Sequence, residues 1–384
     1  MNPCYPAAAV LATVLLSAAP AVKAAEPCPK SCPSGKVPLG IAAPLTGSAA
    51  AFGHSAVKAA ELAVGEINSA GGLLGVPVEP VLGDDRCDAG MAAAIVKKHI
   101  EGGVRFVIGP TCPSVAKEAA SAYAKAGVIQ FVPIITGVEL TQDHPGTTFR
   151  MISNDEQEAK ALATYLASEQ PNKRFLVVFG EFFYRRAIAK MIDAALSPEQ
   201  KKFARLESLA AVTGAYDRLA DQLQKNPPDV IYMSLDAEQA AEFIKKIRER
   251  NIKSVLMGGP HFLSASFWRK YNTAAEGIHT IAPIESLDNT ALRKAADLLK
   301  QADIVPDVVA LSHFAAVQTW AEAVRRAASG EPTAVIGALR SGTFDTAIGR
   351  VAFDGKGDRR DIRYSVLTWK NGTVAPGLAW GPKP

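Results

Sequence analysis

The stretch that decides the fold covers residues 37–75 and has the sequence VPLGIAAPLTGSAAAFGHSAVKAAELAVGEINSAGGLLG. It begins with a short apolar run, 37–42, that is typical of a buried strand, and a loop rich in Pro, Thr and Gly follows. From 54 to 70 apolar residues recur at helical spacing, and Gly71-Gly72 supplies a helix stop. A strand, a loop and a helix form the first half of a βαβ unit, and open α/β sheets bind ligands at loops in this position.

The composition is that of an ordinary soluble globular protein, with 48% hydrophobic and 21% charged residues. At 384 residues the chain is long enough for two domains with separate cores. The formal net charge is only +4, and Lys and Arg are scattered among Asp and Glu, so we expect no nucleic-acid partner. The sequence contains no nucleophile elbow, HExxH or phosphate-binding GxxxxGK motif, and its 6 His form no metal-like cluster. We therefore expect no catalysis, no metal and no cofactor.

The first 24 residues have the features of a secretory signal peptide. Residues 10–22 are rich in Ala, Leu and Val but are short for a membrane span, and Val22-Lys23-Ala24 fits a small-residue cleavage site. Residues 1–6 contain no Lys or Arg, which leaves an uncleaved anchor or a misassigned start codon as alternatives. We expect residues 1–24 to be a signal peptide that is cleaved on secretion.

Four cysteines remain once Cys4 is removed, and an even count in an exported chain favours two disulfides with three possible connectivities. Cys28 and Cys32 are close neighbours that could close a small loop. Cys87 and Cys112 each follow a predicted strand, which places them at one edge of the sheet. A zinc site with four thiolates is the competing interpretation, although the spacings are not those of paired CxxC units.

Strand and helix patterns alternate in two consecutive series, which predicts two domains, each with a parallel sheet covered on both faces. Two helical segments near the carboxyl end of the chain, 290–302 and 306–328, have no strand between them, so they must cover a sheet that already exists. We assign them to the first domain. Strands at 351–353 and 362–370, the second followed by a hairpin turn at Asn371-Gly372, then return to the second domain.

The predicted fold class is therefore α/β, with two Rossmann-like lobes joined by three hinge crossings. The crossings are expected near Met151, Ile281 and Arg350. A connection of three strands hinges readily and leaves a cleft between the lobes. The expected boundaries are 37–151 plus 283–349 for the N-terminal lobe and 152–282 plus 350–380 for the C-terminal lobe.

Four motifs resemble the periplasmic solute-binding proteins of branched-chain amino acid ABC transporters. They are LGIAAPLTGSAAAFG (39–53), AAELAVGEINSAGGLLG (59–75), VLGDDRCDAG (81–90) and VRFVIGPTCPS (104–114). The resemblance extends over 37–380 and is stronger in the first lobe. It implies a type I periplasmic binding protein clamshell that closes over an amino acid and docks onto an inner-membrane ABC permease. It also implies a periplasmic location and a disulfide between Cys87 and Cys112. We expect the protein to be a monomer.

The resemblance also implies ligand-binding residues in both lobes. Phe52 falls where relatives often place an aromatic ring over the ligand, and Thr136 matches a threonine that binds both ends of the amino acid backbone. Tyr184 matches a second-lobe aromatic residue that closes the cleft. A hydroxyl beside a backbone N–H holds a carboxylate well, because hydrogen bonds to charged groups are strong. Each residue has a plainer interpretation: Thr136 caps a turn, and the two aromatic rings pack in a core.

Two positions depart from the family pattern. The serine that usually grips the ligand carboxylate falls at Pro113, which has neither a hydroxyl nor a backbone N–H, so Ser114 is the candidate substitute. The second-lobe acid that binds the ammonium group falls in the loop 259–261, which has the sequence Gly-Pro-His. His261 is kept as a candidate contact, and Asp236 is the candidate replacement acid. The plainer interpretations are a loop histidine and a helix N-cap.

The sequence therefore predicts the solute-binding component of an ABC importer, which captures a small carboxylate-bearing solute by hinge closure. A branched-chain amino acid is the default ligand. Because of Pro113, an aromatic or other organic acid is the first alternative. The second is a periplasmic sensory module that presents its closed form to a receptor.

Overall fold

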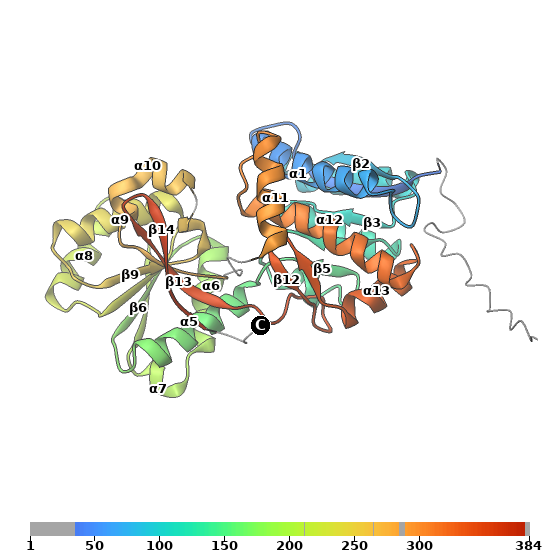
Figure 1. The fold of residues 1–384 in the computed structure, drawn as a ribbon. Helices are drawn as coiled ribbons and strands as arrows, with labels where there is room; N and C mark the ends of the chain where they lie inside the picture. Colours follow the sequence, from blue (N-terminus) through green and yellow to red (C-terminus); the bar gives the residue numbers. More distant parts are fainter. Residues whose placement is uncertain (1–34, 211, 264, 284–288, 381–384) are drawn as a thin grey trace, which may run out of the picture.

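The computed structural model describes residues 35–210, 212–263, 265–283 and 289–380, and it has two lobes, each built on its own sheet (Figure 1). The two-lobed α/β fold expected from the sequence is confirmed. The expected signal peptide, 1–24, and the cysteines Cys28 and Cys32 lie outside the described residues. Among the described residues, no helix combines the length and the apolar character that crossing a bilayer requires.

The first lobe contains a five-stranded parallel sheet with the order β2-β1-β3-β4-β5. Its strands are β1 (Val37–Ala43), β2 (Val78–Asp84), β3 (Phe106–Ile108), β4 (Ile129–Val132) and β5 (Thr148–Arg150). Its helices are α1 (Ala50–Ser69), η1 (Ala89–Met91), α2 (Ala92–Glu101), α3 (Pro113–Lys125), α4 (Glu139–Gln142), α11 (Thr290–Gln301), α12 (Val308–Ala327) and α13 (Pro332–Ser341). A short hairpin of β11 (Phe344–Thr346) and β12 (Gly349–Val351) completes the lobe.

Side chains of the opening strand alternate between the two covered faces of this sheet. Leu39 and Ile41 are fully buried in one core cluster with α1 and α12, whereas Ala42 packs with α2 and α3. Helix α1 begins at Ala50, four residues before the predicted start at His54, because the alanine run at its beginning is a strong helix former. Phe52 therefore lies on the first turn of α1 rather than in the preceding loop.

The second lobe contains a seven-stranded sheet with the order β14-β13-β10-β9-β8-β6-β7. Its strands are β6 (Phe175–Gly180), β7 (Ala204–Leu209), β8 (Val230–Ser234), β9 (Val255–Gly258), β10 (His279–Pro283), β13 (Tyr364–Lys370) and β14 (Thr373–Trp380). Its helices are α5 (Asp155–Glu169), α6 (Phe183–Ala195), α7 (Pro198–Lys201), α8 (Ala215–Lys225), α9 (Ala237–Glu249), η2 (Pro260–Leu263) and α10 (Ala265–Ala275). The predicted helix–strand alternation did not include α10 or α13.

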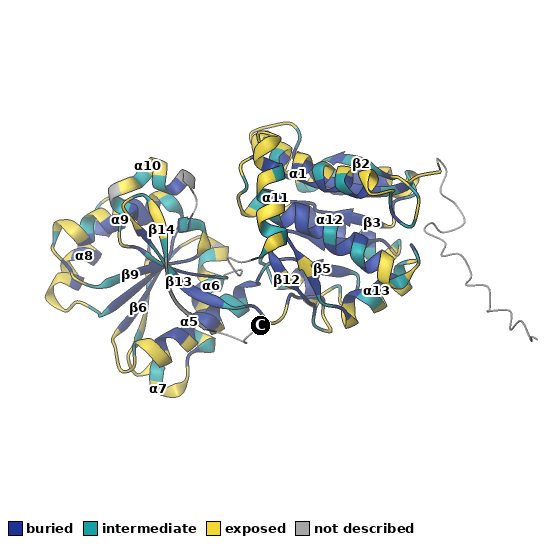
Figure 2. Ribbon diagram, in the orientation of Figure 1, coloured by how far each residue is buried: buried dark blue, intermediate teal, exposed yellow. Residues whose placement is uncertain are grey.

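Both sheets are buried between helices, whose outer faces are exposed (Figure 2). In the second lobe, α5 and α6 pack on one face of the sheet, and α8, α9 and α10 pack on the other. The predicted hairpin turn between β13 and β14 is confirmed. Asn371 and Gly372 have φ angles of 51° and 79°, the left-handed values that a two-residue hairpin of this type requires.

The third crossing between the lobes lies later than expected. Val351 and Phe353 are buried in the first-lobe core, and the Phe353 ring lies 5.0 Å from that of Phe149, centroid to centroid. Ile362 is the first residue afterwards to pack in the second-lobe core. The expected boundary at residue 350 was therefore wrong, because β12 pairs with β11 within the first lobe and draws the following residues into that core.

A buried ion pair holds two of the crossing segments together. Arg150, at the end of β5, is 0% exposed, and its Nε lies 2.8 Å from Oδ1 of Asp358, which is 5% exposed. The guanidinium also donates to the carbonyl oxygens of Ile135 and Gly137. The other Asp358 oxygen accepts a hydrogen bond of 3.0 Å from the Asn154 side chain, at the start of the second lobe. This network fixes the first and third crossings relative to each other.

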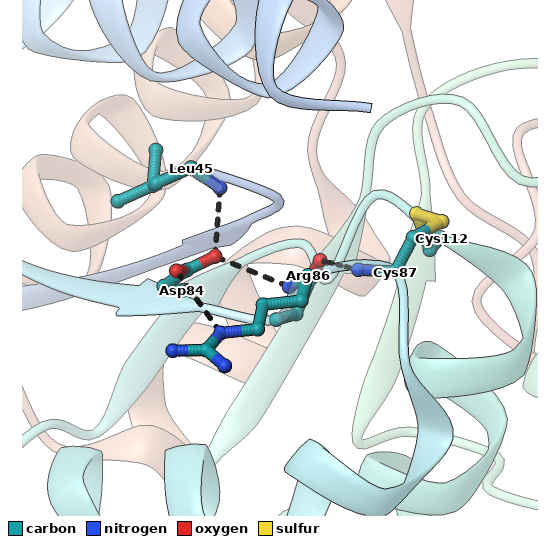
Figure 3. The surroundings of a disulfide bond; sticks show 6 residues. Leu45, Asp84, Arg86, Cys87 and Cys112 are labelled. Carbon is teal, nitrogen blue, oxygen red and sulfur yellow. Dashed lines mark hydrogen bonds and ion pairs between the residues drawn. A yellow bond between two sulfur atoms is a disulfide. The ribbon is translucent and has the colours of Figure 1, made fainter. Parts of the chain in front are cut away.

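The loops around the opening strand are also fixed. Cys87 and Cys112 form a disulfide between the loops that follow β2 and β3, the two neighbours of β1 (Figure 3). Asp84 accepts hydrogen bonds from the backbone N–H groups of Leu45 and Arg86, at 2.8 and 3.1 Å. Burial raises the pKa of Asp84, but these bonds and those from Thr46 outweigh it and lower the pKa to about 2. The carboxylate therefore holds the loop after β1 in place.

Arg150→Met is expected to lower the free energy of unfolding by about 3–5 kcal/mol, because Asp358 keeps its buried charge without a cation. Urea denaturation of the wild type and the variant measures this loss. The matched control is Arg350→Met. Its partner Asp345 lies 3.9 Å away, and both side chains are exposed, so we expect a loss of less than about 1 kcal/mol. Equal losses in the two variants would contradict a structural role for the buried pair.

Candidate functional site

Hydroxyl groups from the two lobes meet where β4 and β6 end. Thr136 follows β4 in the first lobe, and Tyr184 lies in the first turn of α6 in the second. Thr136 Oγ1 and the Tyr184 hydroxyl are 3.0 Å apart, and the Tyr184 hydroxyl donates to Oδ1 of Asp155 at 3.1 Å. The backbone N–H of Asp155 in turn donates to the Thr136 carbonyl at 3.1 Å. Two residues predicted from the sequence, 48 positions apart, are thus brought together.

The aromatic candidates are exposed rather than packed in a core. Tyr184 is 45% exposed and Phe52 is 38% exposed. The alternative interpretation of both rings as core residues is therefore wrong. Since the Tyr184 hydroxyl is held by Thr136 and Asp155, it is the ring that is left open to solvent or solute.

Burial shapes the charge at this contact. Asp155 is 5% exposed, and desolvation raises its pKa, against hydrogen bonds from Thr136 and Tyr184 and the attraction of Arg150. Desolvation also raises the pKa of the Tyr184 hydroxyl, and the Asp155 charge raises it further. Tyr184 therefore stays protonated and acts as a hydrogen-bond donor toward Asp155.

A second acid reaches the same edge of the second-lobe sheet from α5. The Tyr232 hydroxyl, on β8, donates to Oε1 of Glu158 at 2.9 Å. A Cβ atom built on Gly259, just after β9, would lie 3.1 Å from the same oxygen. Burial raises the pKa of Glu158 from 4.5 to about 7, against the bond from Tyr232, and the charge of Asp155 adds to the increase. The loop 259–261 has no acid in its sequence, but it has one beside it in space.

Arg185 follows Tyr184 in α6 and is half-buried. Its guanidinium carbon lies 5.6 Å from the centroid of the Tyr184 ring. Its carbonyl oxygen accepts a hydrogen bond of 3.1 Å from the Ser234 hydroxyl at the end of β8. The backbone of Arg185 is therefore fixed against the carboxyl end of the sheet.

The second-lobe candidates from the sequence have structural partners. Asp236 is the N-cap of α9, and its Oδ1 accepts the backbone N–H groups of Glu238 and Gln239 at 3.1 and 2.9 Å. The capping interpretation of Asp236 is thus confirmed, and its contact with a ligand stays a prediction. His261 lies in η2 with Nε2 3.1 Å from the Leu235 carbonyl oxygen. Burial, together with the charge of Arg185, lowers the His261 pKa to about 4, so the ring is neutral at pH 7.

The first-lobe substitute for the missing serine lies at the start of a helix. Helix α3 begins at Pro113, with Cys112 as its N-cap. Proline is favoured at this first helical position, since its fixed φ suits the helix and no N–H is needed there. Pro113 and Ser114 are both exposed, and no hydrogen bond joins Ser114 to Thr136 in the described part of the chain. The ligand role of Ser114 stays a prediction.

Sequence reasoning missed Asp155, Glu158, Arg185 and Tyr232. Glu158 lies in the first turn of a helix together with other acids, a position that is typical of a solvent-exposed helix face. Its partner Tyr232 is 74 positions away and has the pattern of a buried strand residue. Arg185 carried a usable signal, because it directly follows a predicted ligand residue.

The side chains of the site suit the binding of a polar solute. Among the described residues, no group of three or more His, Cys, Asp or Glu side chains could hold a metal ion. Hydroxyls from Thr136, Tyr184 and Tyr232 lie with the carboxyls of Asp155 and Glu158 and with one guanidinium. This combination of donors, acceptors and both charge signs suits a small solute with ionised groups.

The chain matches the periplasmic binding protein family over residues 36–373. It is similar to the leucine-, isoleucine-, valine-, threonine- and alanine-binding protein of Pseudomonas aeruginosa, with 26% identity over 334 residues, covering 87% of this chain and 90% of that protein.

Solved structures share the fold, among them two solute-binding proteins. The branched-chain amino acid transporter substrate-binding protein LivJ of Streptococcus pneumoniae, in complex with isoleucine, has a TM-score of 0.73 and 23% identity, covering 91% of this chain and 100% of that one. A solute-binding protein of an ABC transporter from R. palustris, in complex with benzoate, has a TM-score of 0.72 and 19% identity. The match covers 91% of this chain and 97% of that one.

Glu158→Gln is expected to gain stability relative to the wild type as the pH rises from about 5 to about 8. With its pKa raised from 4.5 to about 7, the folded protein holds the Glu158 proton more tightly than the unfolded chain does. Wild-type stability therefore falls as the pH rises through this range, whereas the glutamine variant lacks that loss. Urea denaturation at both pH values measures the difference. Glu156→Gln, on the same helical turn, is the control, and an identical pH response in both variants would contradict the prediction.

Proposed function

Because this chain belongs to the periplasmic binding protein family, we propose that it is the solute-binding component of an ABC importer. It captures a small carboxylate-bearing solute between its lobes, closes about the hinge, and delivers the solute to an inner-membrane permease. Residues 1–24 direct it to the periplasm and are removed, and it works there as a monomer.

The observation that carries this proposal is the contact between Thr136 of the first lobe and Tyr184 of the second. A solute that replaces this 3.0 Å contact touches both lobes at once. Contacts to both lobes stabilise a closed state over an open one, because they exist only when the lobes approach. The exposed rings of Tyr184 and Phe52 supply the apolar surface for the rest of the solute.

A branched-chain amino acid is the default ligand. The relative from Pseudomonas aeruginosa is described as binding such amino acids, which supports this choice. The ammonium group of an amino acid requires an acceptor, and Glu158 beside Gly259 offers one where the loop sequence has none. A bound ammonium group lowers the pKa of Glu158, because it stabilises the ionised carboxylate. The acid and the ammonium group are then both charged at neutral pH.

An aromatic or other organic acid is the second candidate. Pro113 lacks the hydroxyl and the N–H that would grip an amino acid carboxylate, and a neighbour in fold is described in complex with benzoate. A monocarboxylate has no ammonium group and so has no use for an ionised Glu158.

A thermal-shift screen over amino acids and aromatic acids tests the proposal. A solute that binds only the folded protein at a concentration of about 100 Kd stabilises it by about 2.7 kcal/mol and raises the melting temperature. We expect at least one branched-chain amino acid or aromatic acid to do so. If no small carboxylate raises the melting temperature, the proposed ligand class is wrong.

Thr136→Ala is expected to weaken binding of the solute found in that screen by about 1–3 kcal/mol, through loss of a hydrogen bond to a charged group. Isothermal titration calorimetry measures the change. Thr147→Ala is the matched control, since its hydroxyl donates to the His144 carbonyl in the same lobe and has no part in the site. Unchanged affinity in Thr136→Ala would remove Thr136 from the site.

A further inference from the structure

The backbone of Arg185, in α6, is fixed against the carboxyl end of the second-lobe sheet. Its carbonyl is bound by Ser234 at the end of β8, and its guanidinium lies over the Tyr184 ring. Tyr184 in turn reaches the first lobe through Thr136. Arg185 is therefore next to the second-lobe residue whose hydroxyl contacts Thr136 of the first lobe.

No carboxylate among the described residues lies within ion-pair distance of the Arg185 guanidinium. Arg150 and Arg250 pair with carboxylates at 2.8 and 2.6 Å, but the Arg185 guanidinium forms no ion pair in the described part of the chain. The ionisable groups that its charge reaches are Glu158, Tyr232 and His261. Burial raises the pKa of Glu158 to about 7, so its negative charge is incomplete at neutral pH, and His261 is neutral. Arg185 therefore has no ion-pair partner in the described part of the chain, and the nearest acid that its charge affects, Glu158, is only partly ionised at neutral pH.

We propose that Arg185 binds the carboxylate of the solute from the second lobe, in place of the first-lobe hydroxyl that Pro113 lacks. The guanidinium is planar and presents paired N–H donors that match the two oxygens of a carboxylate. The inference rests on the proposed function and names the residue that selects for an anionic group. In this arrangement Thr136 and Arg185 approach the solute from opposite lobes, and charge neutralisation accompanies closure.

Arg185 also contacts Tyr184, and a positioning role through that ring is the competing explanation. A cation–π contact at a partly exposed site contributes little, on the order of 0.5–1 kcal/mol. Such a role would affect every solute that uses the Tyr184 ring, whether charged or not. A carboxylate-binding role affects only solutes that carry the negative charge.

The experiment compares Arg185→Met and Arg185→Lys with Arg186→Met, which removes the same charge from the next residue, an exposed one. The probes are L-leucine with L-leucinamide and benzoate with benzamide, each pair differing in the carboxylate alone. Affinity is measured by calorimetry, and circular dichroism checks that each variant is folded. In the probe pair whose carboxylate the wild type binds, we expect Arg185→Met to bind that carboxylate about ten- to a hundredfold more weakly than the wild type does. Binding of the matching amide should not weaken, Arg185→Lys should keep part of the affinity, and Arg186→Met should match the wild type.

Two results would overturn the inference while leaving the proposed function intact. One is equal carboxylate affinity in Arg185→Met and Arg186→Met. The other is an equal loss for the carboxylate and its amide in Arg185→Met, which would assign Arg185 to positioning Tyr184. If the wild type binds neither L-leucine nor benzoate and no other small carboxylate, the proposed function fails and the inference fails with it.

Discussion

The buried pair of Arg150 and Asp358 is the constraint on which the arrangement of the two lobes depends. A charge this deeply buried is tolerated only with a partner and with its remaining donors satisfied, and Arg150 meets both conditions through Asp358 and two carbonyl oxygens. Because Asp358 also accepts from Asn154, the end of the first sheet, the start of α5 and the third crossing meet at one carboxylate. Asp155, the residue after Asn154, receives its place in the site from this junction, and so does the first turn of α5 that carries Glu158.

The pKa values of carboxyl groups in the two lobes are shifted in opposite directions. In the first lobe, donors surround Asp84, and its pKa falls to about 2, so the carboxylate is a permanent anchor for the loop after β1. In the second lobe, Asp155 and Glu158 are desolvated without an ion pair in the described residues, and their pKa values rise. The first set of contacts suits a rigid wall. The second set suits a surface whose charge state responds to what binds there, because a nearby cation or anion shifts the protonation of Glu158.

The sequence was sufficient for the two-lobed α/β fold because strand and helix periods alternate clearly and the opening stretch has a distinctive motif. The sequence was insufficient where contacts between distant parts of the chain, rather than the local sequence pattern, decide the position of a segment. The segment 351–353 has an ordinary strand composition, and only its pairing with β11 reveals that it stays in the first lobe. At the site, Thr136 and Tyr184 could be named in advance because they match positions of the family that the sequence resembles. Glu158 could not, because its helical spacing is that of a solvated acid, and its contact with Tyr232 joins positions that no local pattern relates.

The contact between Thr136 and Tyr184 means that a solute must displace a hydrogen bond that the protein makes with itself. Each hydroxyl already has a partner, so a solute gains only the difference between the hydrogen bonds that it offers and those that it displaces. Neutral solutes that merely exchange one hydroxyl contact for another gain almost nothing, whereas an ionised group gains from its charge. The internal hydrogen bond between Thr136 and Tyr184 is therefore itself a source of selectivity against uncharged compounds, independent of the shape of the site.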